Sequence, residues 1–169
     1  MILLFKKHFL YLSIVLFGAF SLSACSQQKQ SGTQPEQPEV KTVTTNAEPV
    51  SVTMYKNPNC LCCGRWAAYL EENGFSVKEI PTDTLASVKK QQGVPNQLGS
   101  CHTALIEGYV VEGHVPAAAI NKLLKERPDA KGIAAPGMPA QSPGMAEVPG
   151  PVEVYFFNGP DQAAYYDTF

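Results

Sequence analysis

Three cysteines fall within four consecutive positions of this sequence. The segment covering residues 57–66 reads NPNCLCCGRW, so that Cys60 and Cys63 form a Cys-x-x-Cys pair and Cys62 lies inside it. A Cys-x-x-Cys pair can form a redox disulfide, supply half of a zinc site or bind a soft metal ion. A dithiol couple needs only two sulfurs, so Cys62 is the residue that favours metal chemistry.

A fourth cysteine, Cys101, follows at a distance in the sequence. Structural disulfides would need two bridges among these positions, and bridging Cys62 to Cys63 would form a strained vicinal ring. A bridge between Cys60 and Cys63, across one helical turn, is of the easily reduced type. A dithiol oxidoreductase would use Cys60 and Cys63 and leave the other two unexplained, whereas a metal site uses all four sulfurs.

Thiolates are soft ligands, which Cu(I), Zn(II) and iron–sulfur clusters prefer. Zinc usually takes two separated cysteine pairs, and the second pair here is only the vicinal Cys101-His102. The adjacent Cys62 and Cys63 bring sulfurs close enough to bridge several metal ions, which suits Cu(I). We therefore predict a Cu(I) site, with capacity for more than one ion, made by Cys60, Cys62, Cys63 and Cys101. A thiol–disulfide oxidoreductase using Cys60 and Cys63 is the alternative.

Three further side chains are candidate additional copper ligands. Met138 and Met145 stand in two Pro-Gly-Met repeats, and their thioethers can bind copper or simply fill gaps in a packed loop. His114 lies at a predicted strand-to-helix junction, where a histidine can bind metal or hydrogen-bond within the loop. His102 is expected to point to the opposite face from Cys101, because side chains alternate along a strand, and to serve the core or support the ligands.

The elements that must position these residues follow from hydrophobic periodicity. Strands are predicted at 50–55, 75–80, 102–107 and 109–113, and helices at 61–73, 84–92 and 117–126. The order β-α-β-α-β-β-α predicts an α/β, thioredoxin-like mixed sheet with helices on both faces. Gly108 alone links the predicted hairpin. Residues 131–151 are expected to be loop, and 152–157 an added strand, hairpinned through Asn158-Gly159 with the final aromatic residues.

This order places Cys60 to Cys63 in the first turn of the first helix. The unpaired N–H groups and the positive dipole end of a helix stabilise a thiolate there. Cys101 lies at the start of the third strand, and in such a fold that point faces the helix N-terminus. We therefore expect Cys101 to lie beside the other three cysteines.

The N-terminal sequence predicts export from the cytoplasm. Lys6 and Lys7 precede an apolar run from Phe9 to Phe20 and then small residues, so we predict a signal peptide over 1–24 rather than a membrane-spanning anchor. Residues 22–25, Leu-Ser-Ala-Cys, match a bacterial lipobox, which predicts a lipoprotein acylated at Cys25 with palmitate-type chains. The predicted location is the periplasm, anchored to the membrane by lipid.

Composition then divides the remaining chain. Residues 25–49 are rich in Gln, Pro, Ser and Thr and predict a flexible tether, whereas 50–169 have the length of one compact domain. The formal net charge is −2 and no basic stripe is present, so no nucleic-acid partner is expected. The acidic residues form no paired acid–base arrangement, which gives hydrolytic catalysis no support.

Several separated motifs resemble one known family. The segments NPNCLCCGRW, SCHTALIEGYVVEGHVPAAAI and LLKERPDAKGIAAPGMPAQSPGM, with the closing strand, are similar to the periplasmic CopG-type family of copper-resistance proteins. The resemblance runs from about Val50 to the C-terminus. It implies a thioredoxin-like fold, copper bound by the four cysteines named above, and a role in copper redox chemistry or handling.

The predicted function is therefore copper tolerance. It would act by sequestration, by delivery to a copper exporter or a periplasmic copper oxidase, or by cycling between Cu(I) and Cu(II). Only the last would make the protein a copper oxidoreductase, so its status as an enzyme stays open.

Overall fold

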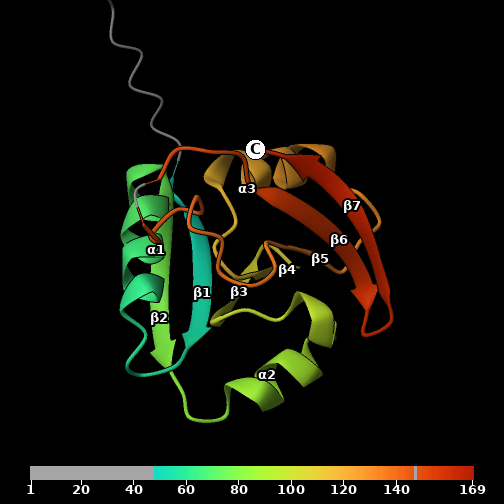
Figure 1. The fold of residues 1–169 in the computed structure, drawn as a ribbon, viewed down its shortest axis with the longest axis horizontal. Coiled ribbons are helices and arrows are strands. Elements are labelled where there is room, and N and C mark those ends of the chain that lie inside the picture. The colour runs from blue at the N-terminus through green and yellow to red at the C-terminus, as the bar shows by residue number, and fades with distance from the viewer. Residues whose placement is uncertain (1–47, 147) are drawn as a thin grey trace, which may run out of the picture. The chain divides into compact units, whose positions relative to one another are not determined.

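The computed structural model describes residues 48–146 and 148–169, so the predicted signal peptide, Cys25 and most of the predicted tether lie outside it. Figure 1 shows the described fold. The strands are β1 Val50–Lys56, β2 Phe75–Pro81, β3 His102–Ile106, β4 Tyr109–Glu112, β5 Gly132–Ala134, β6 Glu153–Gly159 and β7 Gln162–Thr168. The helices are α1 Leu61–Glu72, α2 Leu85–Gln91 and α3 Ala117–Glu126, with a 3₁₀ turn at Asn96–Leu98. Among these residues no helix is both long and apolar enough to cross a bilayer.

The strands form one mixed sheet in the order β2-β1-β3-β4-β5-β6-β7. β1 pairs with β2 in parallel, as the crossover through α1 requires, and β4 pairs with β5 in parallel through α3. The other neighbouring strands are antiparallel. The predicted α/β class, the order of the first seven elements and the added C-terminal hairpin are confirmed.

Alternation along the strands divides the interior into two hydrophobic clusters. The larger one joins Val52, Ala104 and Val111 of the sheet to Trp66 of α1 and Ile120 of α3. The smaller one lies around Val110, Ala134 and Phe157, together with Val94 and with Leu98 of the 3₁₀ turn. Because neighbouring residues of one strand enter different clusters, α1 and α3 cover one face of the sheet, and the segment after α2 covers the other.

Two predictions about strand connections were wrong in detail. The β3–β4 hairpin turns through two residues, Glu107 and Gly108, which both have positive φ (46° and 90°). Two residues of this conformation match the right-handed twist of the flanking strands. β5 was predicted as loop, because Gly-Ile-Ala is too short to show alternation. It forms where Gly132 allows close approach, since a Cβ there would lie 2.1 Å from the carbonyl oxygen of Val110.

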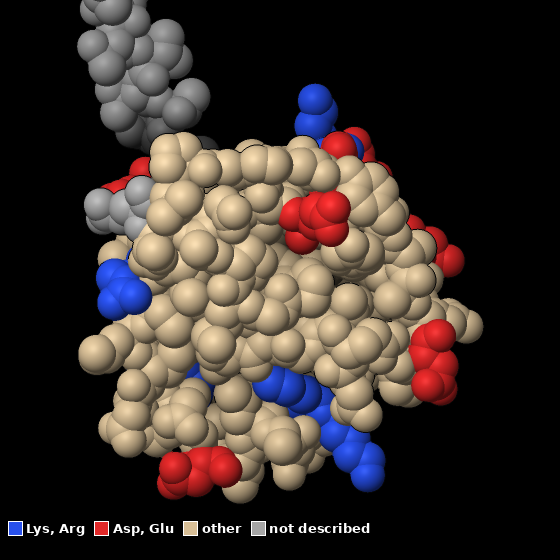
Figure 2. All heavy atoms as spheres, in the orientation of Figure 1, with Lys and Arg blue, Asp and Glu red and all other residues tan. Residues whose placement is uncertain are grey.

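The C-terminal hairpin of β6 and β7 packs beside α3. Lys122 of α3 donates to Asp167 of β7 at 2.5 Å, and the Tyr166 ring lies 4.0 Å from that of Phe156. Most of the face of the molecule in Figure 2 is uncharged, and the charged side chains on it lie in small groups.

Candidate metal centre

The triplet of cysteines lies where β1 gives way to α1. The Cys60 N–H donates to Asn57 O at 3.0 Å, and Cys60 occupies the N-cap position with extended φ and ψ of −79° and 96°. Cys62 and Cys63 belong to the first helical turn, with Cys63 buried and Cys62 half-buried. Burial of Trp66 and Leu70 on the inner side of α1 fixes this orientation, because Cys63, Trp66 and Leu70 recur at helical spacing.

Sheet register brings Cys101 to the same place. β1 and β3 are antiparallel and Lys56 pairs with His102, so the chain that leaves β1 lies beside the chain that enters β3. The Cys101 Sγ is 3.6 Å from Cys63 Sγ and 3.9 Å from Cys62 Sγ, and Cys60 Sγ is 3.4 Å from Cys62 Sγ. The four sulfurs all lie within 4.8 Å of one another. The prediction that Cys101 meets the triplet is confirmed.

The cysteines are present in two chemical states. Cys60 and Cys63 are joined by a disulfide, and Cys62 and Cys101 are free thiols. Two sulfurs are therefore available as thiolates in this form, and reduction of one bond makes four available. The site can accordingly store two electrons or change its number of soft ligands.

His114 extends the cluster with a nitrogen donor. Its Nε2 lies 3.0 Å from Cys101 Sγ, and its Nδ1 lies 2.7 Å from the carbonyl oxygen of Pro143. A carbonyl only accepts, so Nδ1 carries the proton and Nε2 of the neutral ring presents its lone pair toward Cys101. A backbone carbonyl that fixes the tautomer in this way is the usual support of a metal-binding histidine. The structure thus places this candidate ligand beside the thiols.

His102 differs from its prediction. It is buried as expected, but its Nδ1 lies 3.6 Å from Cys101 Sγ, and its ring centroid is 5.0 Å from that of His114. Alternation did not separate His102 from Cys101, because Cys101 lies in a bend before β3 begins. Cys63, Cys101, His102 and His114 form a second group of donors within 4.8 Å. The ring also packs on Trp66 at 4.4 Å, and its Nε2 is buried without a hydrogen-bond partner.

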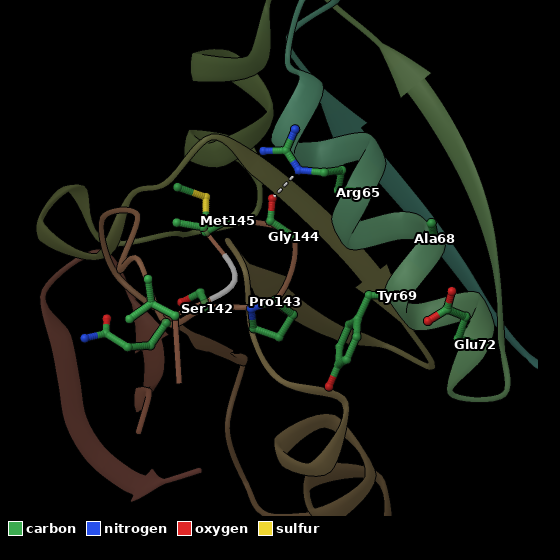
Figure 3. A pocket seen from close by; sticks show the side chains of 11 residues that line it. Arg65, Ala68, Tyr69, Glu72, Ser142, Pro143, Gly144 and Met145 are labelled. Carbon is green, nitrogen blue, oxygen red and sulfur yellow. Dashed lines mark hydrogen bonds between the residues drawn. The ribbon is translucent and has the colours of Figure 1, made fainter. Parts of the chain in front are cut away.

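The two Pro-Gly-Met repeats lie at different places. Met138 is 57 % exposed and lines, with Ser100 and Cys101, a cavity of about 250 Å³. Met145 lines a groove between α1 and residues 141–146, beside Arg65, and Figure 3 shows it next to Gly144. Met138 therefore lines the same cavity as Cys101, whereas Met145 lines the separate groove beside Arg65.

Residues 142–145, which we call the strap, contact the site through their backbone, and the sequence predicted only Met145 among them as a site residue. Arg65 Nε donates to Gly144 O at 2.8 Å, and Pro143 O holds His114 as described above. A Cβ on Gly144 would lie 2.6 Å from the Trp66 backbone nitrogen and 3.0 Å from Cys62 O. The strap therefore packs in direct contact with the first turns of α1. Backbone contacts of this kind leave no side-chain pattern in a sequence.

Burial sets the electrostatics of the site. Burial, followed by the nearby Cys62, raises the pKa of Cys101 to about 11. Burial lowers the pKa of His102 well below its ordinary value, with His114 adding to the effect. Burial also lowers the pKa of His114. Both rings are therefore neutral near pH 7, and Cys101 keeps its proton until an electrophile such as a metal ion replaces it.

The chemistry of these donors fits a thiophilic metal. Each cysteine and histidine offers one sulfur or nitrogen atom, and no carboxylate belongs to either donor group. Soft sulfur with borderline imidazole nitrogen suits copper or zinc and does not suit magnesium or calcium.

Comparisons with known proteins give consistent results. The family described as "Protein of unknown function, DUF411" matches residues 98–145. No curated protein sequence matches the chain. A solved structure titled "Copper resistance protein copG- Form 2" is 42% identical, with a TM-score of 0.66, over 72% of this chain and 99% of that one. A second, titled as form 1 of the same protein, is also 42% identical, with a TM-score of 0.65, over 72% of this chain and 98% of that one.

Proposed function

Because this chain belongs to the family of the copper resistance protein CopG, we propose that it binds Cu(I) in a multi-thiolate site and acts in copper tolerance. The observation that carries the proposal is the meeting of four sulfurs within 4.8 Å of one another. Cys60, Cys62, Cys63 and Cys101 are the ligands, and the bound copper is cargo or substrate. The reduced site has enough thiolates to bridge more than one ion.

His114 and Met138 are the further ligands that the geometry favours. The lone pair of His114 Nε2 already faces Cys101, and Met138 borders the cavity that Cys101 lines. Imidazole and thioether extend the range of copper states that the site accepts, because imidazole also suits Cu(II). Met145 is a weaker candidate, since it lines the groove beside Arg65.

The disulfide supports a role in copper redox cycling. Two thiolates of Cys60 and Cys63 can give one electron each to two Cu(II) ions, which yields two Cu(I) ions and the disulfide found here. Copper tolerance then follows by sequestration, by handing Cu(I) to an exporter or oxidase, or by this cycling. The extracytoplasmic, lipid-anchored location is part of the proposal and is supported by the N-terminal sequence pattern.

The same disulfide favours a second candidate function. A Cys-x-x-Cys disulfide at a helix N-terminus is the arrangement of thiol–disulfide oxidoreductases that act on protein cysteines. In that function Cys60 and Cys63 exchange electrons with a substrate disulfide, and Cys62 and Cys101 have no required role.

One pair of assays separates the two functions. The reduced full-length chain is titrated with Cu(I) against a strong chelator, and insulin disulfide reduction is measured in parallel. We expect more than one tightly held Cu(I) per chain and little insulin reduction. Weak, sub-stoichiometric copper binding with rapid insulin reduction would instead establish the oxidoreductase.

A further inference from the structure

A buried ion pair lies beneath the segment that carries Cys101. The side chain of Glu112, the last residue of β4, is fully buried and pairs with Lys89 of α2. Its carboxylate also accepts from the Ser100 N–H at 2.6 Å and from the Thr103 hydroxyl at 2.7 Å. A charged carboxylate so deep in a protein is tolerated only when donors satisfy it, and here three donors do so.

These donors flank Cys101 on both sides. Ser100 precedes Cys101, and Lys89 Nζ reaches beyond it to His102 O at 3.3 Å and Thr103 Oγ1 at 3.0 Å. The Ser100 hydroxyl in turn donates to Gly137 O at 2.5 Å. The Lys89–Glu112 pair is therefore the point at which α2, β4 and the Cys101 segment are joined.

The segment needs this support because the sheet does not supply it. Cys101 lies in a bend, and the ladder between β1 and β3 begins only at His102. Glycine at position 113 completes the fit, since a Cβ there would lie 2.6 Å from Ser100 Cβ. The position of Cys101 Sγ relative to Cys62 and Cys63 thus depends on hydrogen bonds to Ser100.

We propose that Glu112, held by Lys89, is a positioning residue that keeps Cys101 within ligand distance of Cys62 and Cys63. The inference rests on the proposed function for its role in copper binding. It makes α2, which contributes no ligand, a part of the scaffold of the site. Residues that orient metal ligands typically change affinity 10- to 100-fold when they are replaced.

The first test is a double-mutant cycle in the full-length chain. We expect E112Q and K89M each to weaken Cu(I) binding about tenfold. In a C101S background the same substitutions should have no further effect, because the residue that they position is already gone. K122M, which removes the distant Lys122–Asp167 pair, is the matched control and should bind as the wild type does. Equal weakening by E112Q with and without Cys101 would show a general structural role and overturn the proposal.

The second test does not use copper. In a C60S variant, Cys63 and Cys101 can form a disulfide as one glutathione disulfide is reduced to two glutathione molecules. Peptide mapping after equilibration gives the effective concentration of the two thiols, and we expect E112Q and K89M to lower it, because Cys101 is then held less closely to Cys63. An unchanged value overturns the proposal. If the wild type binds no Cu(I), the proposed function fails, and this measurement still decides the inference.

Discussion

At the scale of single residues, the site is defined by the distances between each cysteine sulfur and the neighbouring donor atoms. Cys101 contacts Cys62, Cys63 and His114 at 3.0 to 3.9 Å, so it is the centre of the donor set, although it lies 38 residues from Cys63 in the sequence. Cys62 has no part in the disulfide, and it is the residue that separates a metal site from a dithiol couple. The sequence indicated this role for Cys62, since it lies inside the Cys-x-x-Cys pair.

The first prediction concerns Cys62. We expect C62S to lower the number of Cu(I) ions bound per chain and to leave the Cys60–Cys63 reduction potential unchanged, because Cys62 is not in that bond. Copper titration and a glutathione redox titration measure the two effects. If copper stoichiometry stays at the wild-type value, Cys62 is not a ligand.

The second prediction compares the two methionines. M138L should weaken Cu(I) binding about tenfold, as loss of a contributing group at a metal site does, because Met138 lines the cavity with Cys101. M145L should bind as the wild type does, since Met145 lines the groove beside Arg65. Leucine has a similar volume, so the fold should tolerate both changes. Equal affinities of the two variants would contradict the assignment of Met138.

At the scale of elements, the sequence predicted the strands and helices whose hydrophobic residues recur at a regular spacing, and it missed short elements and loop contacts that show no such period. Alternation predicted β1 and β2, and the stripe of Trp66 and Leu70 predicted α1. β5 was not predicted, because its three residues are too few to show the alternation of a strand. His102 lies in the core as expected, but the expectation that it points away from Cys101 was wrong, because alternation holds only inside a paired strand. The contact between His114 and Cys101 depends on the strap, which no local pattern describes.

The third prediction tests the close approach of β4 and β5. G132A should lower the free energy of unfolding by about 1–3 kcal/mol, because its Cβ would overlap a backbone oxygen that cannot move aside. G64A in α1 is the control: its Cβ would meet only the end of the Lys56 side chain at 3.9 Å. That change should raise stability by up to about 1 kcal/mol, the helix preference of alanine over glycine. Urea unfolding measures both, and a fully stable G132A would refute this account of the strand pair.

The fourth prediction concerns the pH dependence of the α3–β7 contact. The hydrogen bond from Lys122 lowers the pKa of Asp167. Its contribution to stability is therefore present above the ordinary aspartate pKa of about 4 and is lost as pH falls through the lower folded-state value. D167N should lower the urea midpoint slightly at pH 7, and the difference between the two proteins should shrink as pH falls below about 4, because the carboxylate becomes protonated. A difference that persists at low pH would exclude this ion pair as its cause.

At the scale of the whole molecule, the site depends on chain segments that are far apart in sequence. Residues 60–63, 101, 114 and 142–145 lie together in the folded chain through contacts between different elements and loops. The sequence could predict the meeting of Cys101 with the triplet, because the predicted fold places the start of the third strand opposite the N-terminus of the first helix. It could not predict the strap or the Lys89–Glu112 pair, which depend on the folded positions of loops.

The fifth prediction concerns attachment of the whole chain. If Cys25 carries the lipid, C25A should move the protein from the membrane fraction to the soluble fraction, because the acyl chains can no longer be added. Cell fractionation followed by immunodetection measures this. A C25A protein that stays in the membrane fraction would remove the lipid anchor from the proposal.

The glycine of the strap has a consequence for the two Pro-Gly-Met repeats. Gly137 and Gly144 share a left-handed backbone, but a Cβ at Gly137 would meet no atom within 4 Å, whereas one at Gly144 would strike the backbone of α1. Asparagine, which tolerates that backbone, should therefore be an acceptable replacement at the first position and an unacceptable one at the second. Two copies of one tripeptide are thus not interchangeable: the first admits a larger residue at its glycine, and the second requires glycine because it sets the separation between the strap and α1.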